Sequence, residues 1–121
     1  WVAVALPVDV AQADACLDLL ISASKEYAEA GAAAIVLDSR IGRISGGTGV
    51  PMDWRVAAEF VRHCPLPVLV AGGINPDNAA RALSTTGAAG LDVSSGVEDC
   101  PGIKSPRKLR ALFRACMGEA P

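Results

Sequence analysis

The residues best suited to catalysis by their type and spacing lie near the end of the first third of the chain. An apolar run at residues 32–37 ends in Asp38, and a segment at residues 45–49 then supplies three glycines. A strand that ends in one carboxylate and leads into a glycine-rich loop is the usual layout of an active site on a parallel α/β sheet. The apolar run also favours partial burial of Asp38, and burial favours an acid that holds its proton. Asp38 is therefore a candidate general acid, and a helix cap or a salt-bridged structural carboxylate is an equally weighted alternative.

Two later turns carry groups suited to binding phosphate. These groups are Gly72 and Gly73 in one turn and Ser94, Ser95 and Gly96 in the next. Glycine lets backbone N–H groups approach an anion closely, and serine hydroxyls add further donors. The segment at residues 96–102 is long enough for the short extra helix that often completes a phosphate site in barrels. The alternative is that the glycines only make tight turns between strands and helices.

A second carboxylate, Asp92, falls inside a short predicted strand at residues 89–93. Its side chain must face either the layer of helices or the opposite face of the sheet. A carboxylate facing the helices would be costly to desolvate. We therefore expect Asp92 to face the lumen of a barrel, close to substrate hydroxyl groups.

Hydrophobic periodicity predicts the elements that position these residues. Strands are predicted at residues 2–8, 33–37, 67–71 and 89–93, and helices at 11–30, 54–63, 76–85 and 106–117. Three helix starts carry a capping residue, which is Asp53, Asn75 before Pro76, or Ser105 before Pro106. The predicted inward face of the first helix is Cys16, Leu19, Leu20, Ala23 and Tyr27, and the last helix is predicted to bury Leu109, Leu112, Phe113 and Cys116. Its basic residues, Arg107, Lys108, Arg110 and Arg114, are predicted to face water.

This order of elements predicts an α/β fold of parallel strand–helix units. Right-handed crossovers make consecutive strands parallel and adjacent. A complete (βα)8 barrel takes about 250 residues and eight such units. This chain has 121 residues and four predicted units, and it begins at Trp1 inside an apolar run. We therefore expect a single partial domain at residues 1–121, with a further part of the barrel upstream.

Composition excludes several classes of protein. Hydrophobic residues make up 51% and charged residues 20% of the chain, which excludes disorder. The formal net charge of -2 predicts no nucleic-acid partner, and charged residues interrupt every apolar run before it reaches membrane-spanning length. The four cysteines follow no metal-binding spacing and there is one histidine, so no metal site is predicted. Free thiols of this kind favour a reducing cytoplasm.

Beyond these local patterns, the chain resembles phosphoribosylanthranilate isomerase. The similarity covers nearly all of residues 33–113, and residues before 33 correspond only in outline to the family's fifth strand and helix. Its most specific part is the run Asp-Val-Ser-Ser-Gly-Val-Glu at residues 92–98. The other matching motifs are Asp-Ser at 38–39, Gly-Gly-Thr-Gly at 46–49, Asp-Trp at 53–54, Ala-Gly-Gly-Ile-Asn-Pro-Asp-Asn at 71–78 and Pro-Gly-Ile-Lys at 101–104.

The resemblance implies the C-terminal half of a TIM (βα)8 barrel. It also implies an aldose–ketose isomerase that carries out an Amadori rearrangement of N-(5-phosphoribosyl)anthranilate in tryptophan biosynthesis, with no cofactor. Asp38 occupies the position of the family's general acid. The loop containing Gly47 and Gly49 corresponds to the one that closes over substrate.

The resemblance also assigns the phosphate site. Residues implied to hold the phosphate are Gly72, Gly73, Ser94, Ser95 and Gly96, while Asp92 lines the pocket near the sugar. The family's general-base cysteine and anthranilate-binding arginine belong to its N-terminal half. The implied partners are therefore a phosphosugar substrate and an N-terminal half-barrel, supplied in cis or in trans.

Two alternatives stand beside this interpretation. The chain could be another phosphate-binding barrel enzyme, such as an indole-glycerol-phosphate synthase. It could also be a non-catalytic half-barrel that binds phosphate. A half-barrel has two open sheet edges and an uncovered apolar face, so we expect self-association when the other half is missing.

Overall fold

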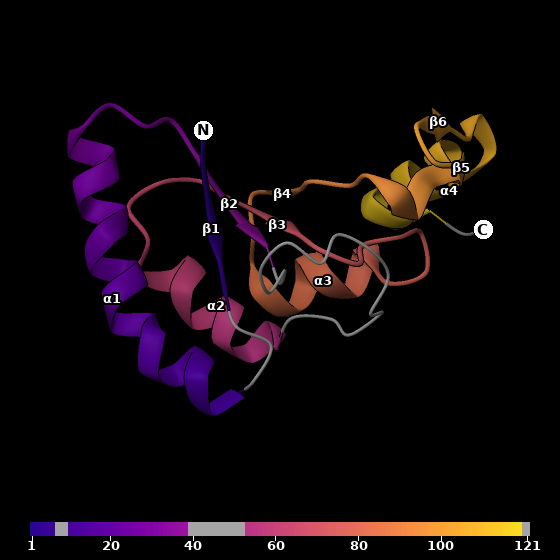
Figure 1. Cartoon of the computed structure of the whole chain (residues 1–121). Coiled ribbons are helices and arrows are strands. Elements are labelled where there is room, and N and C mark those ends of the chain that lie inside the picture. The colour runs from indigo at the N-terminus through magenta and orange to yellow at the C-terminus, as the bar shows by residue number, and fades with distance from the viewer. Residues whose placement is uncertain (7–9, 39–52, 120–121) are drawn as a thin grey trace.

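The computed structural model describes residues 1–6, 10–38 and 53–119. Gly47 and Gly49, the predicted loop glycines, lie outside these residues. The elements are β1 (Val2–Ala5), α1 (Val10–Glu29), β2 (Ile35–Asp38), α2 (Trp54–His63), β3 (Val68–Ala71), α3 (Ala79–Thr86), β4 (Gly90–Leu91), the 3-10 helix η1 (Ser95–Val97), β5 (Glu98–Cys100), β6 (Ile103–Lys104) and α4 (Pro106–Met117) (Figure 1).

The predicted α/β fold with parallel strands is confirmed. Within the described residues, the main sheet has four strands in the chain order β1-β2-β3-β4, and every neighbouring pair is parallel. Helices α1, α2 and α3 lie along the sheet, and α4 lies with the β5–β6 hairpin beyond β4 (Figure 1). Because each strand leads into its helix at the same edge, the turns after the strands gather at one end of the sheet.

One face of the sheet forms the core with the helices. Ile35, Leu37, Val68 and Val70 are at most 2% exposed. The first three pack in one cluster with Ala57 and Phe60 of α2, and Val70 packs in a second cluster with Ala79 and Ala82 of α3. The alternation follows from the two-residue period of a strand. The sheet therefore buries one face against helices and turns the intervening residues to the other side.

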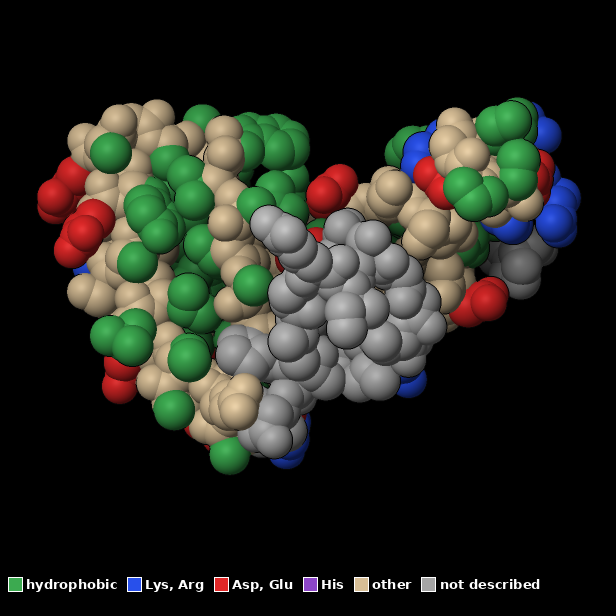
Figure 2. All heavy atoms as spheres, viewed as in Figure 1, with side chains coloured by type: hydrophobic (Ala, Val, Ile, Leu, Met, Phe, Trp, Pro, Cys, Tyr) green, Lys and Arg blue, Asp and Glu red, His purple; other side chains and the backbone are tan. Residues whose placement is uncertain are grey.

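The opposite face of the sheet is much less covered. Ala3 and Ala5 of β1 are exposed and Val36, Asp38 and Leu69 are half-buried, while Ala71, at the end of β3 on the same face, is buried. In the complete barrels of this architecture, that face lines the lumen. Figure 2 shows hydrophobic side chains over much of the surface around α1 and the neighbouring strands on the viewed side.

The predicted inward face of α1 was wrong at one position. Leu19 is 72% exposed, whereas Ala13 and Ser24 are buried and Leu17 and Leu20 pack against the core. At about 100° per residue, the face that starts at Ala13 passes through Leu17, Leu20 and Ser24 and leaves Leu19 roughly 120° away. The buried Ser24 hydroxyl donates to the Ile21 carbonyl at 2.6 Å, so a polar residue occupies a position the apolar pattern did not include.

The start of α3 also differs from the prediction. The helix begins at Ala79 and not at Pro76, because Asn75 makes a turn of its own. Its Oδ1 accepts from the N–H groups of Asp77 at 2.8 Å and Asn78 at 3.2 Å. Strand β4 is likewise shorter than predicted, and Asp92 directly follows it.

The segment after β4 contains a hairpin that the sequence did not predict. The short helix is η1, at Ser95–Val97, and residues 98–104 form the antiparallel pair β5–β6 instead of extending a helix.

Helix α4 has its predicted bounds, with Ser105 Oγ accepting from the N–H of Lys108. Its predicted apolar stripe holds at Leu112, with Leu109 packed in the same cluster, but not at Phe113, which is 59% exposed, or at Cys116, which is also exposed. Among residues 1–6, 10–38 and 53–119, no helix is both long and apolar enough to cross a membrane.

Candidate active site

Asp38 and Asp92 lie on the same face of the sheet, at the same end. Asp38 pairs with Ala71 of β3, while Leu91, directly before Asp92, pairs with Val70. The N–H of Asp92 donates to the Val70 carbonyl at 2.9 Å, which fixes this residue one position beyond β4. Two strand spacings separate the acids, or about 10 Å between backbones, leaving room for a sugar. Asp92 is exposed and Asp38 is half-buried. The register places Asp92 on the face opposite the helix-packed core, and its position near substrate hydroxyls stays a prediction.

The first glycine turn directly follows β3, between the two acids. Gly72 has φ +89° and Gly73 has φ +68°, a left-handed region that side-chain-bearing residues rarely adopt. Asn78 holds this turn, since its Nδ2 donates to the Gly73 carbonyl at 2.9 Å and its Oδ1 accepts from the N–H of Asn75 at 2.8 Å. Asn78 was not among the predicted site residues, although the spacing of two asparagines after Gly-Gly could have suggested a braced turn.

The second turn, Ser94–Gly96, is packed directly against the first. A Cβ on Gly96 would lie 1.9 Å from the carbonyl oxygen of Ile74, the residue after Gly73. In the described part of the chain, the backbone N–H groups of Ser95 and Gly96 have no hydrogen-bond acceptor. First-turn N–H groups of a helix are open in this way because no carbonyl precedes them. The structure therefore brings the two predicted phosphate-binding turns into contact and leaves donors open on one of them.

Basic residues of α4 also approach this turn. A hollow of about 460 Å³ beside Gly96 is lined by Asn75, Pro76, Asp77, Arg107, Lys108 and Ala111. Lys108 was predicted to be a solvated residue, but it is half-buried and its Nζ donates to the Glu98 carbonyl of the hairpin. The sequence pattern could not show this contact, because residue 98 belongs to a hairpin that was not predicted.

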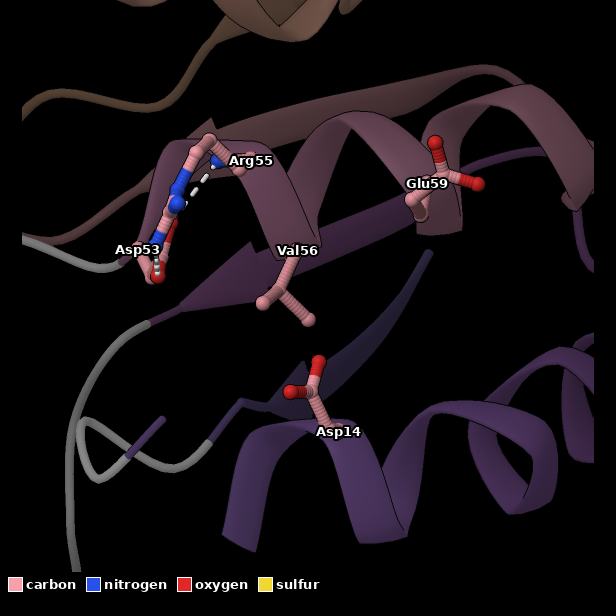
Figure 3. Close-up of a pocket in the computed structure, with 5 residues that line it drawn as sticks. All are labelled: Asp14, Asp53, Arg55, Val56 and Glu59. Atoms are coloured by element: carbon pink, nitrogen blue, oxygen red, sulfur yellow. Dashed lines mark hydrogen bonds and ion pairs between the residues drawn. The ribbon is translucent and has the colours of Figure 1, made fainter. Parts of the chain in front are cut away.

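A second hollow lies between α1 and α2, and Asp53 within it has a structural role. It measures about 230 Å³ and is lined by Asp14, Asp53, Arg55, Val56 and Glu59 (Figure 3). Asp53 is committed to Arg55, with Nη2 to Oδ2 at 3.0 Å, and the Arg55 hydrogen bond lowers the pKa of Asp53. No group of three His, Cys, Asp or Glu residues in the described ranges is arranged to hold a metal ion.

Removing the Asp53 cap should weaken α2 without touching the phosphate turns. Its carboxylate accepts from the N–H of Arg55 at 2.9 Å, so Asp53→Ala should lower the free energy of unfolding by about 1 kcal/mol. Because folding lowers the Asp53 pKa, the cap's contribution is present above the unfolded pKa and is lost as pH falls through the lower folded value. Urea unfolding of the unsubstituted chain and of Asp53→Ala, at pH 7 and below about pH 3, tests both statements. An unchanged difference between the two chains at low pH would contradict the ionised cap.

Known proteins match this chain over most of its length. A family model described as N-(5'phosphoribosyl)anthranilate (PRA) isomerase matches residues 10–115. The N-(5'-phosphoribosyl)anthranilate isomerase of Rhodopseudomonas palustris (strain HaA2) is 44% identical over 113 residues, covering 91% of this chain and 50% of the relative. The corresponding protein of Pseudomonas putida (strain GB-1) is 39% identical over 98 residues, covering 81% of this chain and 45% of the relative.

Solved structures agree with these sequence matches. N-(5'-phosphoribosyl)anthranilate isomerase from Pyrococcus furiosus superposes with a TM-score of 0.71 at 28% identity, over 96% of this chain and 49% of that chain. The protein from Thermus thermophilus gives a TM-score of 0.60 at 35% identity, over 77% and 44%. The chain thus spans about half the length of the relatives it matches. It belongs to the phosphoribosylanthranilate isomerase family.

Proposed function

We propose that this chain is the C-terminal (βα)4 half of a phosphoribosylanthranilate isomerase barrel and supplies its general acid and phosphate site. The observation that carries the proposal is the arrangement at one end of the sheet. Asp38 and Asp92 face the same side, and the two glycine-containing turns after β3 and β4 touch each other beside them. Family membership supplies the substrate, N-(5-phosphoribosyl)anthranilate.

In the proposed reaction, Asp38 protonates the ring oxygen of the ribose. The nitrogen lone pair forms a C1=N bond as the C1–O bond breaks, and the oxygen leaves as a hydroxyl group. A base then removes the proton from C2, and the resulting enolamine tautomerises to the amino-ketose. General acid–base catalysis needs each group within hydrogen-bond reach of the proton that it moves. We assign the base to the N-terminal half-barrel, as the family pattern implies.

The phosphate group would be held at the ends of β3 and β4. Open N–H groups at Ser95 and Gly96, the Ser94 and Ser95 hydroxyls and the Gly72–Gly73 turn supply donors of the kind that bind phosphate. Asp92 follows β4 and is nearer in the sequence than Asp38 to the second of these turns. This position suits a contact with sugar hydroxyls. All four cysteines are free thiols, which supports our placing the reaction in a reducing cytoplasm.

The proposed partner is a second half-barrel that covers the exposed sheet face. The outer edges of β1 and β4 lack a neighbour in the described sheet, and Ala3 and Ala5 are exposed on its uncovered face. Open edges and uncovered apolar faces favour association. The relatives are about twice as long as the matched region, which is the length that four more strand–helix units would supply.

We expect the 121-residue chain alone to self-associate and to lack isomerase activity. Supplying the N-terminal half of a family member should convert it to a 1:1 complex with measurable activity, because the base and the missing sheet face arrive together. Sedimentation velocity and an isomerase assay on the same samples test this expectation. The same N-terminal half alone, and the chain mixed with an unrelated half-barrel, are the controls.

Two outcomes would contradict parts of this proposal. A cooperatively folding monomer of the chain alone would contradict the half-barrel description. A 1:1 complex that binds phosphate without isomerising the substrate would contradict the enzymatic assignment. It would instead favour a non-catalytic phosphate-binding role, since both turns proposed to bind phosphate lie within this chain.

A further inference from the structure

Lys104 reaches from the end of β6 to Ser94, the first residue of the second turn. Its Nζ lies 3.0 Å from the Ser94 carbonyl oxygen, 3.5 Å from Ser94 Oγ and 2.6 Å from Glu98 Oε1. A lysine ammonium has three N–H donors, and these three oxygens account for all of them. Lys104 therefore has no donor left for a phosphate in this arrangement.

The contact with the Ser94 carbonyl bears directly on the Ser95 N–H. The two groups belong to one planar trans peptide, so they point in opposite directions. A cation fixed at the carbonyl oxygen therefore fixes the direction of the N–H on the other side. It also polarises the peptide, which strengthens the N–H as a donor.

Other contacts fix the later part of the turn but leave the Ser94 side weakly held. Gly96 is packed against Ile74, Val97 is 1% exposed, and the Val97 carbonyl accepts from the N–H of Ser105 at 2.7 Å. At Ser94, the hydrogen bond from the Val97 N–H is long, at 3.4 Å. Lys104 therefore makes the stronger contact to the Ser94 carbonyl among the described residues.

Glu98 and the hairpin hold Lys104 in place. The two residues are direct partners across the β5–β6 ladder. The hydrogen bond from Lys104 lowers the pKa of the Glu98 carboxyl, which favours the charged carboxylate beside the ammonium group. Lys108 ties the same strand to α4, donating to the Glu98 carbonyl and lying 3.6 Å from Asp99 Oδ1.

We propose that Lys104 is a positioning residue that orients and polarises the Ser95 N–H for binding the substrate phosphate, without touching the phosphate itself. This inference rests on the proposed function, because it assigns a residue to the phosphate site of the same reaction. This role differs from that of a direct phosphate ligand, because a ligand would point its ammonium group at the anion.

Phosphate binding to the full chain tests this role directly. Lys104→Met keeps the length of the side chain but removes the donors, and it should raise the dissociation constant for inorganic phosphate about tenfold. Lys104→Arg and Glu98→Gln should each raise it less than about threefold, because a cation still reaches the Ser94 carbonyl. Binding is followed by phosphorus NMR, and the amide proton shift of Ser95 is followed in parallel. Lys25→Met, on the exposed part of α1, is the control for loss of one positive charge.

In the enzyme reconstituted with an N-terminal half, Lys104→Met should raise KM by a similar factor and leave kcat within about twofold. Equal losses in Lys104→Met and Glu98→Gln would overturn the inference, since they would reflect hairpin stability alone. So would unchanged phosphate binding in Lys104→Met while the original chain binds, and in that case the proposed function would stand. Absence of phosphate binding by the original chain would overturn both. If circular dichroism shows that the methionine variant does not fold, Lys104→Arg and Glu98→Gln provide the test. A Ser95 amide shift and a phosphate affinity close to those of the unsubstituted chain in both variants support the inference, and loss of either in Lys104→Arg overturns it.

Discussion

Replacing Asp38 by asparagine is expected to lower kcat of the proposed reconstituted isomerase about a thousandfold, because the ribose ring oxygen would then lack its proposed proton donor. The substitution preserves size and shape, so the sheet should be undisturbed. Asp38 stands at the end of β2, while the turns proposed to bind phosphate follow β3 and β4. KM should therefore change much less than kcat. Steady-state kinetics of the two complexes at matched concentration measure both constants.

A second aspartate provides the control for Asp38. Asp18 is exposed on α1, so Asp18→Asn removes the same charge without approaching the open face of the sheet. It should leave kcat unchanged. If Asp38→Asn kept more than about a tenth of the original rate, the general acid would have to be another group. Phosphate affinity measured on the same variants shows whether the phosphate turns survive the change.

Local chemistry was sufficient to predict where two helices begin. Helix α2 begins after Asp53 and α4 after Ser105, and both caps use a side-chain oxygen that accepts from a backbone N–H of the first turn. A cap is visible in the sequence because donor and acceptor lie within three residues. The same reasoning failed at α3. Asn75 before Pro76 has the chemistry of a cap, but it closes a separate turn that Asn78 ties to Gly73.

The shared face of Asp38 and Asp92 could also be predicted, because strand alternation and parallel register determine it. The contact between the two turns could not. Gly96 meets Ile74 across 22 residues of sequence, and Lys104 reaches Ser94 across 10. Such contacts depend on how two loops approach each other in space, which no local pattern encodes. The family motif included these residues without indicating what each one touches.

Gly96→Ala should have the largest effect on stability and on phosphate binding. The added Cβ would lie 1.9 Å from the Ile74 oxygen and 2.9 Å from its carbonyl carbon. Both atoms are backbone, so no side-chain rotation can relieve the overlap and the two turns must separate. We expect the free energy of unfolding to fall by about 3 kcal/mol. Phosphate affinity should fall with it, since the two turns proposed to bind the anion would no longer be in contact.

Gly102 distinguishes a clash from backbone strain. A Cβ there would meet nothing within 4 Å, but its φ is +84°, so Gly102→Ala costs the left-handed penalty of about 1 kcal/mol without a collision. Gly96→Ala and Gly102→Ala should therefore differ both in thermal stability and in affinity for phosphate. Gly102→Ala should lose a little stability and keep its affinity for phosphate. Should Gly96→Ala behave in the same way, the two turns would not be packed as described, and the phosphate site would need a different construction.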